Sequence, residues 1–275
     1  MSKQSKTAGK TANESRKYEF TGETTDQYGR TLRRIRAVAD FGDVKAGDVG
    51  GWIEGRGNLS DYGNAWVYDN ACVYGHARVL GNAKVSGNAF VYVCAEVYGN
   101  AKVLNYAAVY GNAAVCGNAA VCGSAAVHGD ANVFGHAAVF GYAAVRDNAN
   151  VFGHAKVFDS AEVFGHAKVC DYAEVCRRAK VHGDATVCGG VTVGGDAEVR
   201  NDGDCIVLRN FWSSGRWLSY TRSNKMWTAG CFSGTGKELV AKAYRDSRAK
   251  GKCYKLTVEY VEKVLKVLEK NGGAA

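Results

Sequence analysis

The sequence predicts an all-β solenoid, a triangular parallel β-helix with three hexads (about 18 residues) per coil, between a small N-terminal β cap and a C-terminal α+β module. A six-residue unit, Ala-x-Val-x-Gly-x, repeats over residues 65–199 without an insertion or deletion. Valine recurs there 23 times in register, and alanine stands two residues before each, with Val191 the one exception. The chain has no proline and 35 glycines, so its reversals depend on residues that tolerate positive φ.

Two segments precede the repeat. Residues 1–16 are polar, carry four basic side chains and lack apolar periodicity, which predicts a disordered basic tail. Residues 17–62 contain two strand-like segments around a Gln-Tyr-Gly turn, and the large side chains Phe20, Phe41 and Trp52. Because the end of a solenoid exposes an apolar core and unpaired backbone groups, we expect residues 17–62 to form an N-terminal cap.

Within the solenoid, residues 63–200, alanine and valine are two positions apart and therefore share the inner face of a strand. Glycine or aspartate, commonly followed by asparagine or histidine, then forms a corner. A coil of 18 residues aligns mostly opposite charges: Arg78 with Glu96, Lys156 with Glu174, Glu162 with Lys180, and Lys180 with Glu198. Its one unfavourable pair is Lys84 with Lys102, whereas a 12-residue coil aligns several like charges, so three hexads per coil are favoured.

The run VYGNAAVCGNAAVCGSAAV resembles the hexapeptide repeat of left-handed parallel β-helix proteins, a family best known for trimeric acyltransferases. The segments KYEFTGE, RIRAVADFGDVKAGDVGGWIE and WTAGCFSGT resemble uncharacterised YdcK-like repeat proteins of phages and enteric prophages. The first resemblance implies a left-handed coil. For an enzyme, it also implies acyl transfer from acetyl-CoA with a histidine as general base, and the candidates are His136 and His154.

Several features of the repeat argue against catalysis. Acyltransferases that this repeat resembles interrupt their hexads with an active-site loop, whereas these hexads are uninterrupted. No carboxylate follows His136 or His154 at an orienting spacing, and both occupy a corner position where asparagine is commonest. The chain also lacks a CxxC or HxxxxH motif. We therefore expect a non-enzymatic protein without a metal or cofactor, with an acyl-CoA-dependent acyltransferase as the alternative.

The middle of the repeat predicts self-association. Over residues 103–145, Asp130 is the only formal charge, and most outward side chains are alanine, aromatic or cysteine. Soluble monomers seldom expose so large an apolar surface, so we expect a homo-oligomer, most simply a homotrimer. The candidate interface residues are Leu104, Tyr110, Cys116, Cys122, Phe134 and Phe140.

The C-terminal module, residues 201–275, carries 14 basic and 7 acidic residues. Strands are predicted at residues 205–209, 216–222 and 226–232, and helices at 236–247, capped by Thr235, and 254–270. Basic residues beside aromatics can bind nucleic acid or a nucleotide, although aromatics in so small a module also serve as its core. The candidate binding residues are Arg209, Trp212, Arg216, Trp217, Arg222, Lys225 and Trp227.

Five of the ten cysteines follow valine at positions that tyrosine and phenylalanine also occupy, so we interpret them as small apolar side chains in a reducing compartment. The sequence has no apolar run of the roughly 18 residues that span a membrane, and its start lacks the apolar core of a signal peptide. We expect a cytoplasmic protein, in the host cytoplasm if phage-encoded, with no membrane partner.

The leading hypothesis is a phage- or prophage-type oligomeric scaffold or binding protein that presents its basic module to a macromolecule such as a host protein. Besides the acyltransferase, a further alternative is a protein that sequesters nucleic acid or a small anionic ligand through this module.

Overall fold

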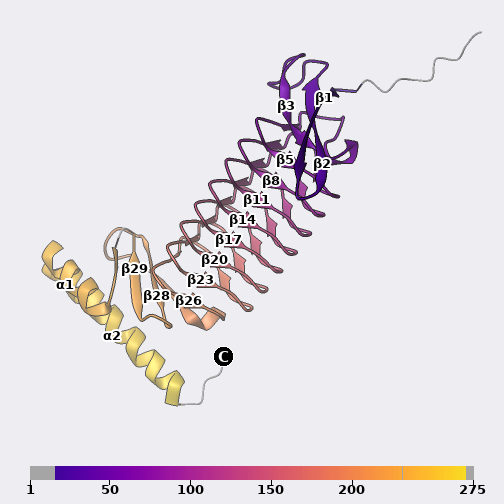
Figure 1. Ribbon diagram of the computed structural model, residues 1–275. Coiled ribbons are helices and arrows are strands. Elements are labelled where there is room, and N and C mark those ends of the chain that lie inside the picture. Colours follow the sequence, from indigo (N-terminus) through magenta and orange to yellow (C-terminus); the bar gives the residue numbers. More distant parts are fainter. Residues whose placement is uncertain (1–15, 231, 271–275) are drawn as a thin grey trace, which may run out of the picture.

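The computed structural model describes residues 16–230 and 232–270, and it is a β-solenoid flanked by two end structures. Figure 1 shows the stacked coils between the indigo hairpin of β1 and β2 and the orange and yellow C-terminal elements. Apart from Arg16, the predicted tail 1–16 lies outside the described residues. No helix in the described part of the chain is long and apolar enough to cross a membrane.

Three sheets form the sides of the solenoid. The first sheet contains β1 (Tyr18–Gln27), β2 (Arg30–Ala37), β3 (Val49–Ile53), β5 (Cys72–Val73), β8 (Phe90–Val91), β11 (Ala108–Val109), β14 (Ala126–Val127), β17 (Ala144–Val145), β20 (Glu162–Val163), β23 (Lys180–Val181) and β26 (Glu198–Val199). The second contains β4 (Trp66–Val67), β7 (Lys84–Val85), β10 (Lys102–Val103), β13 (Ala120–Val121), β16 (Ala138–Val139), β19 (Lys156–Val157), β22 (Glu174–Val175) and β25 (Thr192–Val193). The third contains β6 (Arg78–Val79), β9 (Glu96–Val97), β12 (Ala114–Val115), β15 (Asn132–Val133), β18 (Asn150–Val151), β21 (Lys168–Val169) and β24 (Thr186–Val187).

The strand register confirms the prediction of 18 residues per coil, since Val73 pairs with Val91 and every later repeat strand follows the same spacing. Three predicted charge pairs form salt bridges: Arg78 with Glu96 at 3.1 Å, Lys156 with Glu174 at 3.0 Å, and Glu162 with Lys180 at 3.9 Å. Lys84 does face Lys102 in the register. Its ammonium is instead held by Asp43 of the cap segment at 2.7 Å, which offsets the like charge.

The core of the solenoid consists of the repeat alanines and valines, all of which are buried. Between the strands, most first corner positions have positive φ; Gly117, for example, has a φ of 69°. A Cβ at Gly117 would lie 3.0 Å from the backbone nitrogen of Gly135 in the next coil. Glycine is therefore favoured here for two reasons: it adopts the positive φ of the turn, and its lack of a Cβ lets the corners of neighbouring coils stack closely.

The predicted cap segment contributes more than a hairpin. β1 and β2 pair antiparallel, and β2 pairs antiparallel with β3. β3 then pairs parallel with β5, so it already belongs to the coil stack. Tyr18 and Trp66 are fully buried, with Phe41 packed edge-on against Trp66 at 5.4 Å. These side chains close the N-terminal end of the apolar core.

The C-terminal module contains an antiparallel sheet of β27 (Cys205–Arg209), β28 (Trp217–Thr221), β29 (Met226–Ala229) and β30 (Phe232–Gly234), followed by α1 (Gly236–Asp246) and α2 (Arg248–Lys270). Thr235 caps α1, as predicted, and accepts a hydrogen bond from the Glu238 N–H. The predicted third strand is divided at Gly230, where φ is 57°. The second helix begins earlier than predicted because Ser247 Oγ accepts a hydrogen bond from the Lys250 N–H, at 3.1 Å.

The module is packed onto the last coil. On one face of β28, Ser219 Oγ donates a 2.7 Å hydrogen bond to the carbonyl of Thr192 in the solenoid. Leu218 and Tyr220, on the other face, join the apolar cluster formed with α1 and α2. A sheet covered on both faces closes the C-terminal end of the solenoid and fixes the helices on its outer side.

Candidate binding site in the C-terminal module

A pocket of about 280 Å³ lies between the module's sheet and its two helices. Ser213, Ser214 and Arg216 line it from the loop between β27 and β28. Lys242 lines it from α1 and Lys250 from the first turn of α2. The pocket therefore collects side chains from three separate segments.

Local hydrogen bonds fix the loop over residues 210–216. Asn210 is buried, and its side-chain amide donates a 2.7 Å bond to the hydroxyl of Tyr254 on α2. The backbone N–H of Gly215 donates to the carbonyl of Asn210, and Gly215 has a φ of 67°. Arg209 Nε donates to the carbonyl of Gly215 at 3.1 Å. This loop is thus anchored both internally and to α2.

Positive charge dominates the pocket. Arg216, Lys242 and Lys250 line it together with a single acidic residue, Asp246. Within residues 16–230 and 232–270, none of the three cations forms a salt bridge, whereas many charged side chains of the solenoid do. Their positive charge is therefore available to an anionic ligand. The N-terminus of α2, which adds a partial positive charge, lies at the same end of the module.

Neighbouring groups support these cations. Gly230 gives room to Arg216, because a Cβ at Gly230 would lie 2.9 Å from Arg216 Nη1. The Lys242 ammonium lies over the ring of Phe232, with 5.4 Å between Nζ and the ring centroid. Each contact limits the positions that a flexible basic side chain can occupy.

The structure brings together only some of the predicted binding residues. Arg209, Trp212 and Arg216 all belong to the anchored loop or flank it, and Trp212 packs edge-on against Tyr254 at 5.7 Å. Arg222 and Lys225 lie at the opposite end of β28, in its turn to β29. The remaining two differ: Trp227 is buried in the module core, whereas Trp217 is 42% exposed and lies close to Gly190 of the solenoid.

Three residues of this site are not among the candidate binding residues. Phe211 is 85% exposed at the turn of the anchored loop, which is unusual for a phenylalanine that follows a strand. Lys242 and Lys250 come from different helices. The chain is extended at Ser247 between these helices, so no helical periodicity links the two lysines. Their only signal in the sequence is their positive charge, which is too common among helices to stand alone.

The structure places His136 and His154 in a column of corner residues. Asn64, Asn82, Asn100 and Asn118 form a ladder of side-chain hydrogen bonds between 3.0 and 3.1 Å long. His136 Nε2 is 3.4 Å from the Asn118 amide, and the rings of His136 and His154 stack at 4.8 Å. In the described part of the chain, neither ring is hydrogen-bonded to a carboxylate. Both histidines continue the asparagine column.

The six candidate interface residues are half-buried and surround the coil. Tyr110 follows a strand of the first sheet; Leu104, Cys122 and Phe140 follow strands of the second; and Cys116 and Phe134 follow strands of the third. One face stands out, because Phe90, Ala108, Ala126 and Ala144 make an uncharged column on the first sheet. Beside it run the stacked rings of Tyr74, Tyr92, Tyr110 and His128, with centroids 4.6–5.1 Å apart.

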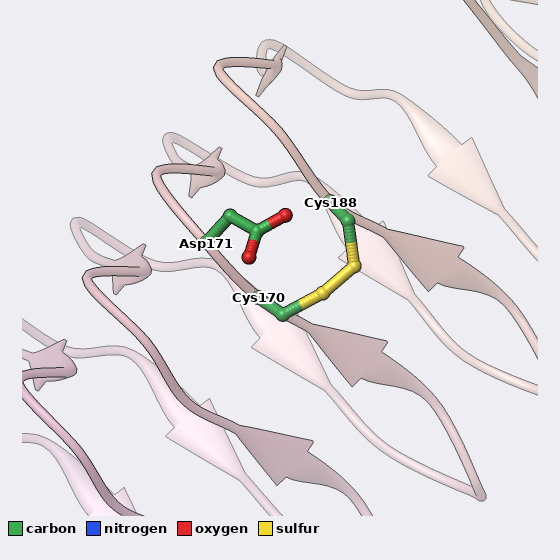
Figure 2. Close-up of side chains that lie close together, drawn as sticks. All are labelled: Cys170, Asp171 and Cys188. Atoms are coloured by element: carbon green, nitrogen blue, oxygen red, sulfur yellow. A yellow bond between two sulfur atoms is a disulfide. The ribbon is translucent and has the colours of Figure 1, made fainter.

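The prediction that the cysteines serve only as small apolar side chains is wrong for Cys170 and Cys188, which form a disulfide. Figure 2 shows the two side chains directed at each other from neighbouring coils, with Asp171 beside them. The 18-residue coil sets their Cα atoms 4.7 Å apart, a separation that a disulfide can span. The Asp171 carboxylate accepts a 3.1 Å hydrogen bond from the Gly189 N–H, so it supports the next corner.

No family model and no curated protein matches this chain.

Proposed function

We propose that the protein is a non-enzymatic β-solenoid scaffold that presents its C-terminal module to an anionic macromolecule, and that this partner is a single-stranded nucleic acid. The observation that carries the proposal is that the anchored loop and its pocket bring together three cations, which form no salt bridge with any residue the structure describes, and the exposed ring of Phe211. Single-stranded nucleic acids are held by basic side chains along the backbone and by aromatic rings that stack on bases. Because stacking and backbone contacts tolerate any sequence, we expect little base specificity.

Self-association of the solenoid, most simply as a trimer, is part of the proposal. The uncharged column on the first sheet and the tyrosine stack beside it support this contact. Several modules on one assembly would engage a strand together and raise its apparent affinity without new contacts. Light scattering at micromolar concentration tests the oligomer, and a monomeric mass would contradict it.

Two further aspects of the proposal rest on the repeat. The place of His136 and His154 in the asparagine column supports a structural role for these residues rather than acyl transfer. Seven cysteines in the described residues are free, which favours a reducing compartment despite the one disulfide. We accordingly place the protein in the cytoplasm, that of a host if the chain is phage-encoded.

Fluorescence anisotropy with a labelled single-stranded oligonucleotide tests the binding function. If three phosphates are neutralised, the affinity should fall with a logarithmic salt slope of about −2, at about 0.7 per phosphate. Between 50 and 200 mM salt this is a roughly 15-fold loss. The double substitution Arg216→Ala with Lys242→Ala should weaken binding, while Lys156→Ala on the solenoid serves as the control. Absence of binding at 50 mM salt, or equal binding by both variants, refutes the proposal.

A further inference from the structure

The pocket beside the anchored loop is small for a binding site. Its volume of about 280 Å³ lies just below the range of roughly 300–1,000 Å³ that is common for small-molecule sites. A stretch of nucleic acid backbone does not fit into such a volume, whereas one terminal group does. The size of the pocket thus indicates the end of a ligand rather than its middle.

The charge of the pocket indicates what that terminal group is. Arg216, Lys242 and Lys250 contribute three positive charges and Asp246 one negative charge, which leaves a net charge of +2. A phosphate monoester carries about −1.5 to −2 at neutral pH and offers three acceptor oxygens, whereas each phosphodiester inside a strand carries a single negative charge. The net charge therefore matches a terminal phosphate better than an internal one.

Hydrogen-bond donors are available for all three oxygens. The hydroxyls of Ser213 and Ser214 line the same pocket as the guanidinium of Arg216 and the ammonium groups of both lysines. The Ser214 hydroxyl is 3.4 Å from the side-chain Oδ1 of Asn210, a long contact that leaves this hydroxyl able to turn to a ligand. Charge-assisted bonds of this kind are about twice as strong as neutral ones.

The position of Phe211 connects this pocket to a strand. Phe211 stands two residues before Ser213 in the same anchored turn, with its ring in solvent. A nucleotide whose terminal phosphate enters the pocket would leave its base outside, within reach of an aromatic ring on which it can stack. One short loop could thereby engage both parts of a terminal nucleotide.

Building on the proposed function, we infer that this pocket binds the terminal phosphate monoester of a nucleic acid strand. Either end of a strand can carry this group, so the experiment separates the two. Anisotropy titrations compare oligonucleotides of one sequence that have a 5′-phosphate, a 3′-phosphate, or hydroxyl groups at both ends. Binding should be about 10- to 100-fold tighter for one phosphorylated form than for the hydroxyl form, the range expected for a few bonds to a charged group.

Matched variants localise the effect. Lys242→Ala with Lys250→Ala should abolish the preference for a phosphorylated end and leave residual binding of the hydroxyl-ended strand. Lys252→Ala, an exposed lysine of α2 outside the pocket, should keep the preference. Unchanged helical circular dichroism verifies that the variants are folded.

The outcomes separate this inference from the proposed function. Equal affinity for all three oligonucleotides overturns the pocket's role while the module remains a nucleic acid binder. Failure of every oligonucleotide to bind overturns the proposed function itself. A phosphoserine peptide that competes as well as the phosphorylated strand overturns the assignment to nucleic acid, because the pocket then binds the phosphate group without any contribution from the nucleotide.

Discussion

The disulfide between Cys170 and Cys188 should stabilise the C-terminal coils to a measurable extent. The perturbation is its removal, either by reduction or by the double substitution Cys170→Ala with Cys188→Ala. Neither cysteine belongs to the alanine and valine core cluster; each directly follows a strand of the third sheet, and they join two consecutive coils. Removal therefore tests the connection between coils with little change in core packing.

The magnitude follows from the length of the loop that the disulfide closes. The two cysteines are 18 residues apart. In the chain-entropy description, closing a loop of that length in the unfolded chain stabilises the folded state by about 3 kcal/mol. Because neighbouring coils of a solenoid interact mainly with each other, we expect the loss to appear in the coils near the disulfide.

Hydrogen exchange measured by mass spectrometry reports this local stability. Amides of strands β21 and β24 should exchange about 100-fold faster in the reduced protein, the factor that corresponds to roughly 3 kcal/mol. The double alanine variant should match the reduced wild type and show no further response to reductant. Cys122→Ala, at a free cysteine in the middle of the solenoid, is the control. Equal exchange rates in oxidised and reduced wild type would show that the disulfide does not stabilise these coils.

Four further predictions follow from particular residues. Replacing His136 and His154 with asparagine should change the free energy of unfolding by less than about 1 kcal/mol. The new asparagines would extend the hydrogen-bonded asparagine column, and these bonds would compensate for the lost stacking of the two imidazole rings. Gly117→Ala should lower it by at least about 1 kcal/mol, because φ is positive and the next corner is close. Phe211→Ala should weaken oligonucleotide binding by about 1–3 kcal/mol. Burial lowers the pKa of Lys17 to about 8. The buried charge therefore destabilises the folded state in full below pH 8, and this destabilisation decreases as the pH rises from 8 toward the pKa of Lys17 in the unfolded chain.

Denaturant titrations test the stability predictions for the histidines, Gly117 and Lys17, and anisotropy tests the binding prediction for Phe211. For Lys17, the quantity compared is the stability difference between Lys17→Met and the wild type, which should shrink between pH 8 and pH 9.5; a constant difference contradicts the assigned pKa. Gly203→Ala, at a glycine with open space around its Cα, is the control for Gly117. A large loss of stability in the double asparagine variant would contradict the corner role of the histidines.

The solenoid could be predicted because repetition multiplies a weak local signal. A single Ala-x-Val unit does not predict a fold, but its unbroken repetition requires that the same side of every strand faces the core. Stacked charges such as Arg78 with Glu96 then indicate the number of residues per coil. The same spacing aligned Cys170 with Cys188, but alignment alone did not show whether the thiols bond. Contacts that do not follow the 18-residue spacing could not be predicted. One example is the ion pair of Lys84 with Asp43, which lies 41 residues earlier in the chain.

The candidate site was only partly predictable for the same reason. The composition of the module indicated basic and aromatic residues, and three of the candidates, Arg209, Trp212 and Arg216, lie in or beside the anchored loop. It could not distinguish Trp227, which fills the core, from Phe211, which stands in solvent. The loop beside the pocket is held by a hydrogen bond that Asn210 donates to Tyr254, 44 residues later in the sequence, and no local pattern encodes that contact.

Photo-cross-linking would show whether the anchored loop and its pocket contact nucleic acid. An oligonucleotide with a photoreactive base at each end would be irradiated with the full-length protein, and the cross-linked peptides would be identified by mass spectrometry. Cross-links at Phe211 or its neighbours in residues 210–216, suppressed by Arg216→Ala with Lys242→Ala, are the predicted result. Cross-links confined to the solenoid would place the nucleic acid away from the C-terminal module and contradict this binding site.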